Sequence, residues 1–282
     1  MSPETANLHS DAIDYDPLKS VVGRIVSRSV LLRKLFYLAL GMLFLRQWHV
    51  RAELKRIARE RRNKIKGIFD AGSGYGQYTY LMAKLFPQAH ILAVDVKEEQ
   101  LADGRWFSEK VGHKNVEYVL GDLTVFQRSE SADLAVSADV MEHILEDEAV
   151  YRNVFATLRR GGRFIITTPT AETETIPGQS FHSVIGEHVR EGYTEREFRE
   201  KITRAGLVVE KLRRTYTPLW GSLAWHILQR IPVRLLTISK LFAIVVIPWM
   251  IVLYPFAALC MWLDVKSKGT KGGGWLMVAH KT

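Results

Sequence analysis

The feature that most restricts the fold of this chain is a regular alternation of short apolar strands with amphipathic helices over residues 65–170. The expected strands lie at 68–69, 91–94, 116–120, 134–136 and 164–168. Helices are expected between them, among others at 78–86 and at 148–159, the second ending at Gly161-Gly162 because glycine stops helices. Strands that alternate with helices form a mostly parallel sheet that is covered on both faces.

Two further strands complete the expected sheet. Thr194 followed by Glu197 is a capping box that begins a helix to Arg204, and strands are expected at 207–217 and 274–280. The fold class is therefore α/β, with a Rossmann-like, seven-stranded, mostly parallel sheet, an N-terminal helical region and a helical insert between the sixth and seventh strands. The expected parts are an N-terminal region at 1–64, a core at 65–217, an apolar insert at 218–264 and a return to the core at 265–282.

A glycine-rich loop follows the first strand, with the sequence Asp70-Ala71-Gly72-Ser73-Gly74-Tyr75-Gly76. Glycines let the backbone turn tightly and let a ligand approach the N–H groups at the start of the next helix. The G-x-G-x-G spacing differs from the G-x-G-x-x-G of dinucleotide-binding loops, and the carboxylate of Asp70 would repel a pyrophosphate and attract an ammonium group. The loop favours a ligand with an ammonium group, and a purely structural turn is the alternative.

Polar residues also follow the next three expected strands. Asp95 ends the second strand 23 residues after Gly72, where an acid can hydrogen-bond ribose hydroxyls. Asp122 follows the third strand, where an acid can accept a hydrogen bond from an adenine amino group while Leu123 packs on the ring. The segment Asp139 to His143 follows the fourth strand. Because parallel strands end at one edge of a sheet, these residues are expected to converge on one crevice.

These motifs resemble those of the class I S-adenosylmethionine-dependent methyltransferases. The glycine loop is similar to that family's first motif, Val94-Asp95 to its acidic second-strand end, Gly121-Asp122 to its third motif and 158–164 to the turn before its fifth strand. The resemblance implies S-adenosylmethionine as the cofactor, with its methionine part at Asp70 and the loop, its ribose at Asp95 and its adenine at Asp122. The expected cofactor-binding residues are Asp70, Gly72, Ser73, Gly74, Gly76, Asp95, Val96, Asp122, Leu123 and Ala138.

The segment after the fourth strand is also similar to the ubiquinone-pathway O-methyltransferases, in which an acid and a Glu-His pair gather a divalent metal. Asp139 stands where glutamate is usual and shortens the reach, so no bound metal is expected. A helix start that shapes the cofactor pocket is the alternative role. The expected catalytic residues are His143, His188 and Glu142, because histidine can take a proton near neutral pH and His188 lies in the long loop where an acceptor would enter. An ordinary loop histidine is the alternative for His188.

The charge of the chain indicates a negatively charged partner. Its formal net charge is +9, and residues 51–66 carry eight cations against two acids. No aromatic residue interleaves that run, and Ser137-Ala138-Asp139 replaces the Asn-Pro-Pro-Tyr type of base-flipping signature. We therefore expect an anionic membrane surface and no nucleic acid, with a solvated helix face as the alternative for the basic run. The single cysteine, Cys260, excludes an intramolecular disulfide and a zinc site of several cysteines.

An apolar run at residues 35–45 precedes the basic run, with Arg33 before it and Arg46 and Trp48 after it. Eleven residues are too few to cross a hydrocarbon core, which needs about 20. The run can lie in the interface as an amphipathic helix with Trp48 and the arginines at headgroup level, and a helix packed on the core is the alternative. The acidic start lacks the pattern of a signal peptide, so the N-terminus is expected in the cytosol.

A second apolar stretch, residues 241–263, contains no charged side chain and includes Pro248 and Pro255. Its 23 residues are long enough to cross a bilayer once. However, the resemblance implies that the strands it connects are antiparallel neighbours, and basic residues flank both ends. The pattern favours a hairpin that dips into the membrane from the cytoplasmic side and breaks at the prolines.

The insert follows a strand that ends at the edge carrying the cofactor residues. The sequence therefore predicts a monotopic or peripheral methyltransferase at the cytoplasmic face of a membrane, with a lipophilic acceptor such as a lipid, a quinone or a terpenoid. A hydrophobic lid or a dimer interface in a soluble enzyme is an alternative for the insert. For the whole chain, the alternatives are a catalytically silent cofactor-binding membrane adaptor and a nucleic-acid methyltransferase.

Overall fold

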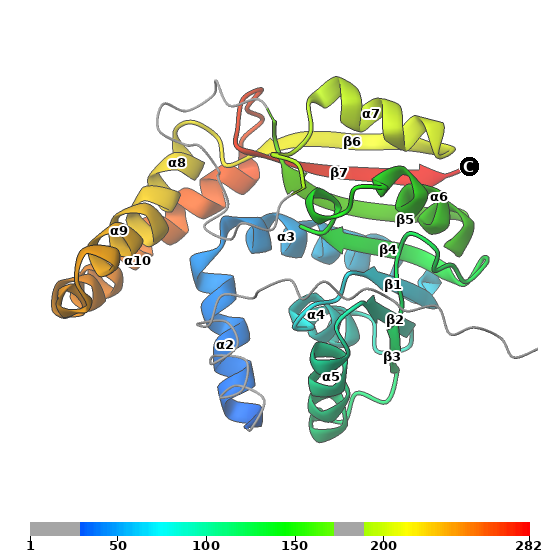
Figure 1. Ribbon diagram of the computed structural model, residues 1–282, viewed down its shortest axis with the longest axis horizontal. Helices are drawn as coiled ribbons and strands as arrows, with labels where there is room; N and C mark the ends of the chain where they lie inside the picture. Colours follow the sequence, from blue (N-terminus) through cyan, green and yellow to red (C-terminus); the bar gives the residue numbers. More distant parts are fainter. Residues whose placement is uncertain (1–28, 172–188) are drawn as a thin grey trace, which may run out of the picture.

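The computed structural model describes residues 29–171 and 189–282 and confirms the expected α/β fold. Seven strands form one sheet in the order β3-β2-β1-β4-β5-β7-β6, and only β7 runs antiparallel to its neighbours (Figure 1). The strands are β1 (Gly67–Ala71), β2 (His90–Asp95), β3 (Val116–Leu120), β4 (Ala132–Ala138), β5 (Leu158–Pro169), β6 (Leu207–Thr215) and β7 (Gly274–Lys281).

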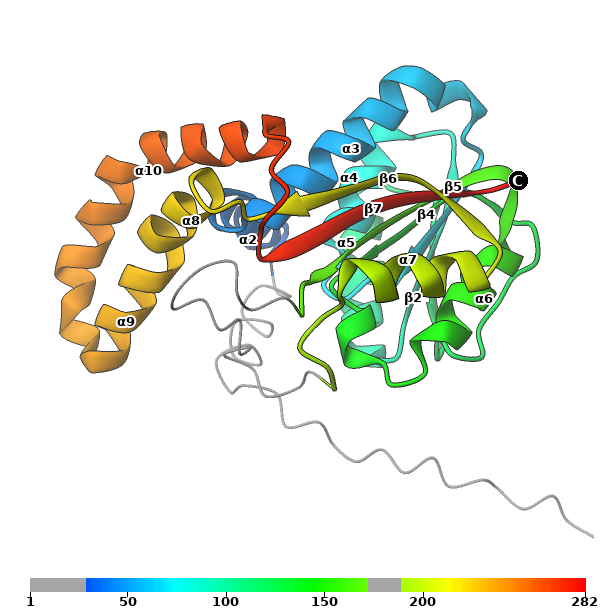
Figure 2. The ribbon, with the colours of Figure 1, turned by 90° about the horizontal axis from the view of Figure 1, so that it is seen from above.

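Helices cover both faces of the sheet (Figure 2). One face packs on α3 (Leu45–Arg61) and α4 (Gln77–Leu85), the other on α6 (Asp147–Thr157) and α7 (Glu195–Arg204). Successive residues of a strand point to opposite faces of the sheet. Ile68 of β1 therefore packs on the face covered by α3 and α4, and Phe69 packs on the face covered by α6 and α7. The remaining elements of the core are α5 (Glu98–Val111), which packs beside β2 and β3, and the short 3₁₀ turns Arg62–Lys64 and Met141–His143.

Local signals placed one helix correctly and another only in part. The Thr194 side chain accepts a hydrogen bond from the Glu197 N–H, and α7 follows as expected. The helix expected at 148–159 is wrong at its end, because α6 stops at Thr157 and β5 begins at Leu158. Leu158 is fully buried and pairs with Ala132 of β4, so contacts across the sheet override the helical pattern there.

The N-terminal apolar run lies mostly in α2 (Val30–Leu43), and α3 begins at Leu45, with Phe44 between the two helices. The prediction that Arg33 lies at headgroup level is wrong, because Arg33 is fully buried. Its guanidinium donates to the Tyr37 hydroxyl at 3.1 Å and to the carbonyl of Tyr75, in the glycine loop, at 3.3 Å. The Tyr37 hydroxyl donates to the same carbonyl at 2.6 Å. One face of α2 is therefore packed on the core, which was the alternative expectation. The opposite face exposes apolar side chains, among them Leu31, Leu35 and Leu38.

The insert is a pair of antiparallel helical arms, which we call the helical hairpin (220–266). The outgoing arm contains α8 (Trp220–Trp225), a π turn (His226–Arg230) and α9 (Ile231–Ile238), and the returning arm contains a 3₁₀ turn (Lys240–Phe242) and α10 (Ala243–Lys266). The expected break at the prolines is wrong, because the chain reverses near Ser239 and α10 continues through Pro248 and Pro255. Both prolines are exposed. Figure 2 shows α10 curving around the outgoing arm, as prolines on one side of a helix can cause.

The base of the hairpin is fixed to the core. Ile227, Ala257 and Met261 pack in one buried cluster with Leu45 of α3. The carboxylate of Asp264 is also fully buried, and it accepts hydrogen bonds from the Thr217 N–H at 2.8 Å and from the Thr217 hydroxyl. It is 2.8 Å from Nε2 of His49 in α3. Among the described residues, 240–266 is the single helical stretch long and apolar enough to cross a membrane, a statement about length and composition only.

We expect Asp264→Ala to loosen the hairpin. The substitution leaves the buried donors of Thr217 and His49 without their acceptor, and a buried donor left unsatisfied costs about 1–3 kcal/mol. The free energy of unfolding, measured by urea titration, should fall accordingly, and protease should cut within 220–266 sooner. Glu148→Ala is the control, because it breaks an ion pair with Arg204 on the surface, where such pairs contribute about 0–1 kcal/mol. An equal decrease in the free energy of unfolding in the two variants would contradict the inference that Asp264 fixes the base of the hairpin to the core.

Candidate active site

The glycine loop lies at the carboxyl edge of the sheet, between β1 and α4. The N–H groups of Gly72 and Ser73 donate to the Val94 carbonyl at 2.9 and 3.0 Å, which ties the loop to β2. Gly72 and Gly74 have φ of +84° and +50°. A Cβ at Gly72 would lie 2.4 Å from Val140, whereas the nearest atom to a Cβ at Gly74 is Oε1 of Gln100 at 3.7 Å. Gly72 therefore serves packing, and Gly74 leaves space that a ligand can approach.

Asp95 holds the loop from the end of β2. Its Oδ2 accepts from the Gly74 N–H at 2.8 Å and its Oδ1 from the Lys97 N–H at 3.1 Å. The side chain is partly exposed, and each carboxylate oxygen has a second lone pair for a hydroxyl donor. Val96 is exposed beside it. This arrangement suits the role that the resemblance implies for Asp95.

Asp70 is buried below the loop and bonds within the protein. Its Oδ2 accepts from the Thr79 hydroxyl at 2.5 Å. Burial, with a contribution from the charge of Asp95, raises the pKa of Asp70 to about 7. The hydroxyls of Ser73 and Ser137 are buried and have no hydrogen-bond partner in the described part of the chain. Buried polar atoms normally have partners, so these two hydroxyls fit a site that a polar ligand completes.

The expected adenine-binding residues lie farther along the same edge. Asp122 is exposed, and its Oδ1 accepts from the N–H and the hydroxyl of Thr124 at 2.8 and 2.7 Å. Leu123 is buried in the hydrophobic core, which leaves little of its side chain to pack on a ring. Ala138 is partly buried where β4 ends and pairs with Thr167 of β5.

An acidic residue and an arginine meet at the end of β4. Asp139, with φ of +60°, forms an ion pair with Arg46 of α3 and accepts from the Thr167 hydroxyl at 3.2 Å. The prediction that Arg46 lies at headgroup level is therefore wrong. The Arg46 N–H donates to the hydroxyl of Tyr216, which follows β6, at 3.4 Å. Arg46 is not among the site residues that the sequence predicts, because an arginine after an apolar run gives no local sign of its partner.

Glu142 is a buried acid with a raised pKa. Its side chain is buried, and its Oε2 accepts from the Thr168 hydroxyl at 3.3 Å. Burial and the nearby charge of Asp139 raise the pKa of Glu142 to about 8, so it is mostly protonated at neutral pH. His143 follows it and is exposed, and His188 lies outside the described residues. Glu142 and His143 are thus placed at the site edge, and their catalytic roles stay predictions.

The pKa of Glu142 predicts how stability depends on pH. Between about pH 4.5, its ordinary pKa, and about pH 8, the folded protein holds a proton that the unfolded chain releases, so folding stability falls as pH rises. Glu142→Gln removes this contribution to the pH dependence of stability and keeps a hydrogen-bond acceptor for the Thr168 hydroxyl. Its stability relative to the parent should therefore grow from pH 5 to pH 8 in urea unfolding. Glu98→Gln, at an exposed ion pair, should show no such growth. A difference between Glu142→Gln and the parent that is constant with pH would mean that Glu142 is ionised throughout.

The metal expectation concerns the same residues. Within 29–171 and 189–282, no group of three His, Cys, Asp or Glu side chains is placed to hold a metal ion. Arg46 already neutralises Asp139. The expectation that turnover needs no divalent metal stays a prediction.

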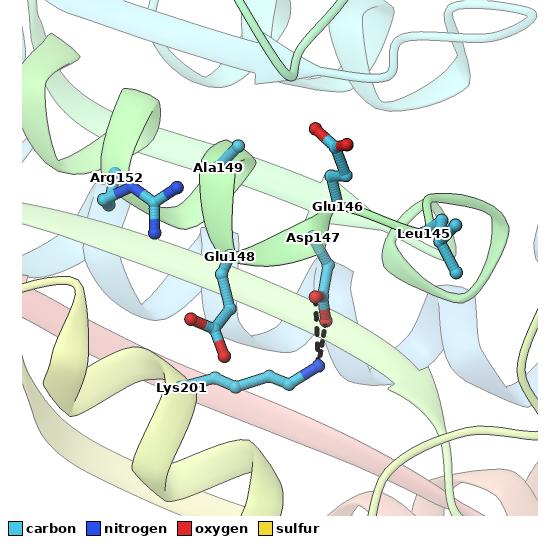
Figure 3. Close-up of a pocket in the computed structure, with 7 residues that line it drawn as sticks. All are labelled: Leu145, Glu146, Asp147, Glu148, Ala149, Arg152 and Lys201. Atoms are coloured by element: carbon cyan, nitrogen blue, oxygen red, sulfur yellow. Dashed lines mark hydrogen bonds and ion pairs between the residues drawn. The ribbon is translucent and has the colours of Figure 1, made fainter.

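A separate pocket lies at the start of α6 (Figure 3). It contains the ion pair between the Asp147 carboxylate and Nζ of Lys201, 2.8 Å apart. Asp147 is buried and also bonds Arg190 at 3.0 Å and the Tyr193 hydroxyl at 2.5 Å. These bonds join α6 and α7 to the segment before α7, whose Val189 N–H donates to the Glu142 carbonyl. The charged residues of this pocket therefore hold α6 and α7 together, and we do not assign the cofactor to it.

The comparisons with known proteins agree with this geometry. Residues 63–215, more than half of the chain, match the family described as Methyltransferase domain. This chain belongs to that family. The methyltransferase is 30% identical, over 106 residues, to the malonyl-[acyl-carrier protein] O-methyltransferase of Bacillus anthracis. That match covers 38% of each chain, so the methyltransferase spans well under half the length of this curated relative.

Solved structures show the same fold. An O-methyltransferase from a trans-AT PKS multienzyme of Brevibacillus brevis, in complex with S-adenosyl-L-homocysteine, has a TM-score of 0.57 at 13% identity, over 92% of this chain and 79% of that one. The geranyl diphosphate C-methyltransferase of Streptomyces coelicolor has a TM-score of 0.51 at 11% identity, over 77% and 72%. S-adenosylmethionine is the cofactor of this methyltransferase. The open space at Gly74, the carboxylate of Asp95 and the unpaired hydroxyl of Ser73 fit it.

Proposed function

We propose that this methyltransferase methylates a lipophilic acceptor, such as a lipid, a quinone or a terpenoid, at the cytoplasmic face of a membrane. One observation carries the proposal. The helical hairpin connects the end of β6 to the start of β7, so it leaves the sheet at the edge that holds the glycine loop and Asp139 (Figure 1). Its returning arm exposes apolar side chains, including Leu241, Ile244 and Val252. Exposed apolar patches of this extent are typical of interaction surfaces.

The hairpin and the site share residues, which supports a common function. The ring of Tyr216 packs in the buried cluster at the hairpin base, and its hydroxyl accepts from the Arg46 N–H. Arg46 in turn pairs with Asp139. Burial and the charge of Asp139 raise the pKa of the Tyr78 phenol, on which Arg46 and Tyr216 also act. An acceptor that reaches the site from the hairpin would therefore meet a polar group of tyrosines, Arg46 and Asp139.

The chemistry asks mainly for positioning. S-adenosylmethionine supplies an electrophilic methyl group when bound, and holding the acceptor atom in line with it provides much of the rate. The protein then has to orient the acceptor and, if the acceptor loses a proton, to receive that proton. The exposed His143 is one candidate, and Glu142 is the other in its ionised form, which predominates only above its pKa of about 8. The fold accepts isoprenoid acceptors in at least one case, since the Streptomyces coelicolor enzyme was solved with geranyl diphosphate.

The test is turnover with a membrane extract. The purified protein is incubated with S-adenosylmethionine and liposomes made from total cellular lipid, and S-adenosylhomocysteine is measured together with the mass spectrum of the lipids. We expect product formation and one lipid species heavier by a methyl group. Water-soluble extract from the same cells is the control. Product formation with the soluble extract alone would overturn the lipophilic acceptor, and cofactor binding without product in either extract would favour a silent adaptor.

A further inference from the structure

The helical hairpin has its longest exposed apolar surface on α10, and its basic residues lie at the two ends of α10 and on the outgoing arm, which gives it a preferred orientation on a membrane. We propose that α10 lies in the plane of an anionic bilayer, with its outer face among the acyl chains and the basic residues of the hairpin at headgroup depth. The proposal rests on the membrane association in the proposed function but not on methyl transfer. It differs from a hairpin that dips into the bilayer tip first.

The outer face of α10 is one continuous apolar stripe. Its exposed large side chains recur at intervals of three, four and seven residues, which places them on one side of a helix. They are Ile244, Val245, Ile247, Ile251, Val252, Phe256, Leu259 and Trp262, preceded by Leu241 in the turn before the helix. The residues on the other side of α10, such as Val246, Ala257 and Met261, are buried against the protein. The stripe therefore runs along the whole helix and is not concentrated at the tip.

The charges at the two ends of α10 decide between the orientations. Lys240 precedes the helix at the tip and Lys266 ends it at the base. α10 itself has 24 residues, which extend about 36 Å along the path of the helix at 1.5 Å per residue. The sequence predicts that the basic residues on both sides of 241–263 lie at the same membrane surface. A helix of this length can keep both lysines at that surface only if it lies in the plane, since a perpendicular dip carries Lys240 through the ~30 Å core.

The outgoing arm adds two more charges to this argument. Arg230 and Arg234 lie between the sheet and the tip, and Arg234 is exposed. Arg230 is placed over the ring of Trp225 and bonds His226 at 2.8 Å, which keeps it beside the arm. A dip would bring both arginines into hydrocarbon, at about 2.5–3.5 kcal/mol for each charge at the centre. In the in-plane orientation, both stay at headgroup depth, where anionic lipids attract them.

The same charges favour a bilayer over a second copy of the chain as the occupant of this face. An antiparallel contact along α10 would place Lys240 of one copy near Lys266 and Lys268 of the other. A parallel contact would place each lysine near its own equivalent. Both arrangements bring like charges together, whereas an anionic headgroup layer satisfies the lysines at both ends.

The experiment measures the depth of three positions along α10. Leu241→Cys, Val252→Cys and Trp262→Cys are made one at a time in a Cys260→Ala background, because Cys260 is the single cysteine of the chain. Each variant is labelled with a small fluorophore and bound to liposomes of phosphatidylcholine and phosphatidylglycerol that carry nitroxides at graded depths. We expect similar quenching depths at Leu241 and Trp262, and an equal or greater depth at Val252 because α10 curves around the outgoing arm (Figure 2). Val208→Cys on β6 is the exposed control and should not be quenched.

The outcomes separate the two proposals. A depth that increases steadily from Trp262 to Leu241 would overturn the in-plane orientation while leaving membrane association and turnover untouched. No quenching at any position, with dimers in sedimentation, would overturn the bilayer as the occupant of this face. Equal depths at Leu241 and Trp262 without turnover of any lipid would support the orientation and count only against the lipophilic acceptor.

Discussion

Asp95→Ala should lower the affinity for S-adenosylmethionine by at least tenfold. The substitution removes the acceptor of the Gly74 and Lys97 N–H groups and the carboxylate proposed to bind the ribose. A hydrogen bond to a charged group contributes about 1.5–3 kcal/mol, and 1.4 kcal/mol corresponds to a factor of ten. Isothermal titration calorimetry with S-adenosylmethionine measures the change.

The matched control is Asp133→Ala. Asp133 also accepts two backbone N–H groups, those of Lys66 at 2.6 Å and Gly67 at 2.9 Å, but it lies at the opposite edge of the sheet. The Asp133→Ala variant should be less stable than the parent and should bind the cofactor with the parent affinity. If both variants bind with the parent affinity, the cofactor site is not at Asp95.

A second pair of variants tests the approach to the loop. Gly74→Ala and Gly112→Ala each add one methyl group at a positive φ, +50° and +76°, with nothing closer than 3.7 Å at either position. Both therefore carry backbone strain without a clash, of roughly 1 kcal/mol. Only Gly74→Ala should weaken binding, because only its methyl group enters the space proposed for the cofactor. Equal affinities would mean that the ligand does not approach Gly74.

Val245→Glu with Val252→Glu should largely abolish binding to anionic liposomes and, with it, turnover of a bilayer acceptor. Each substitution removes an apolar side chain from the acyl region, worth about 1.5 kcal/mol, and places a charge there at a further cost of several kcal/mol. Both valines are exposed, at 54% and 72%, so the fold should be unaffected. Liposome flotation and S-adenosylhomocysteine formation are the measurements.

The control makes the same two substitutions elsewhere. Val125 and Val208 are exposed to 76% and 45% and lie outside the hairpin. Val125→Glu with Val208→Glu should float like the parent, which separates the effect of the α10 surface from that of added negative charge. A Val245/Val252 variant that still methylates a membrane acceptor at the parent rate would show that the hairpin face is not the route of the acceptor.

The core of the fold could be predicted because each of its elements carries a local signal. The expected strand at 116–120 coincides with β3, and Thr194 caps α7 as expected. Period-two and period-3.6 patterns are local, and the residues that turn or cap the chain act on their immediate neighbours. The glycine loop and Asp95 could be predicted for a related reason, since a parallel sheet brings the ends of its strands together.

The tertiary structure alone decided where the apolar helices and the arginines point. Residues 241–263 contain no charged side chain, so no polar stripe in the sequence tells which side of α10 is packed and which is exposed. Contacts with residues far away in the chain settled it, among them Asp264 with His49. Arg33 and Arg46 flank an apolar run in the sequence, yet they bond the Tyr75 carbonyl and Asp139. The sequence by itself determined the α/β core and the cofactor edge, because local patterns encode them. The direction of the hairpin and the partners of the arginines depend on long-range packing, which no short stretch of sequence contains.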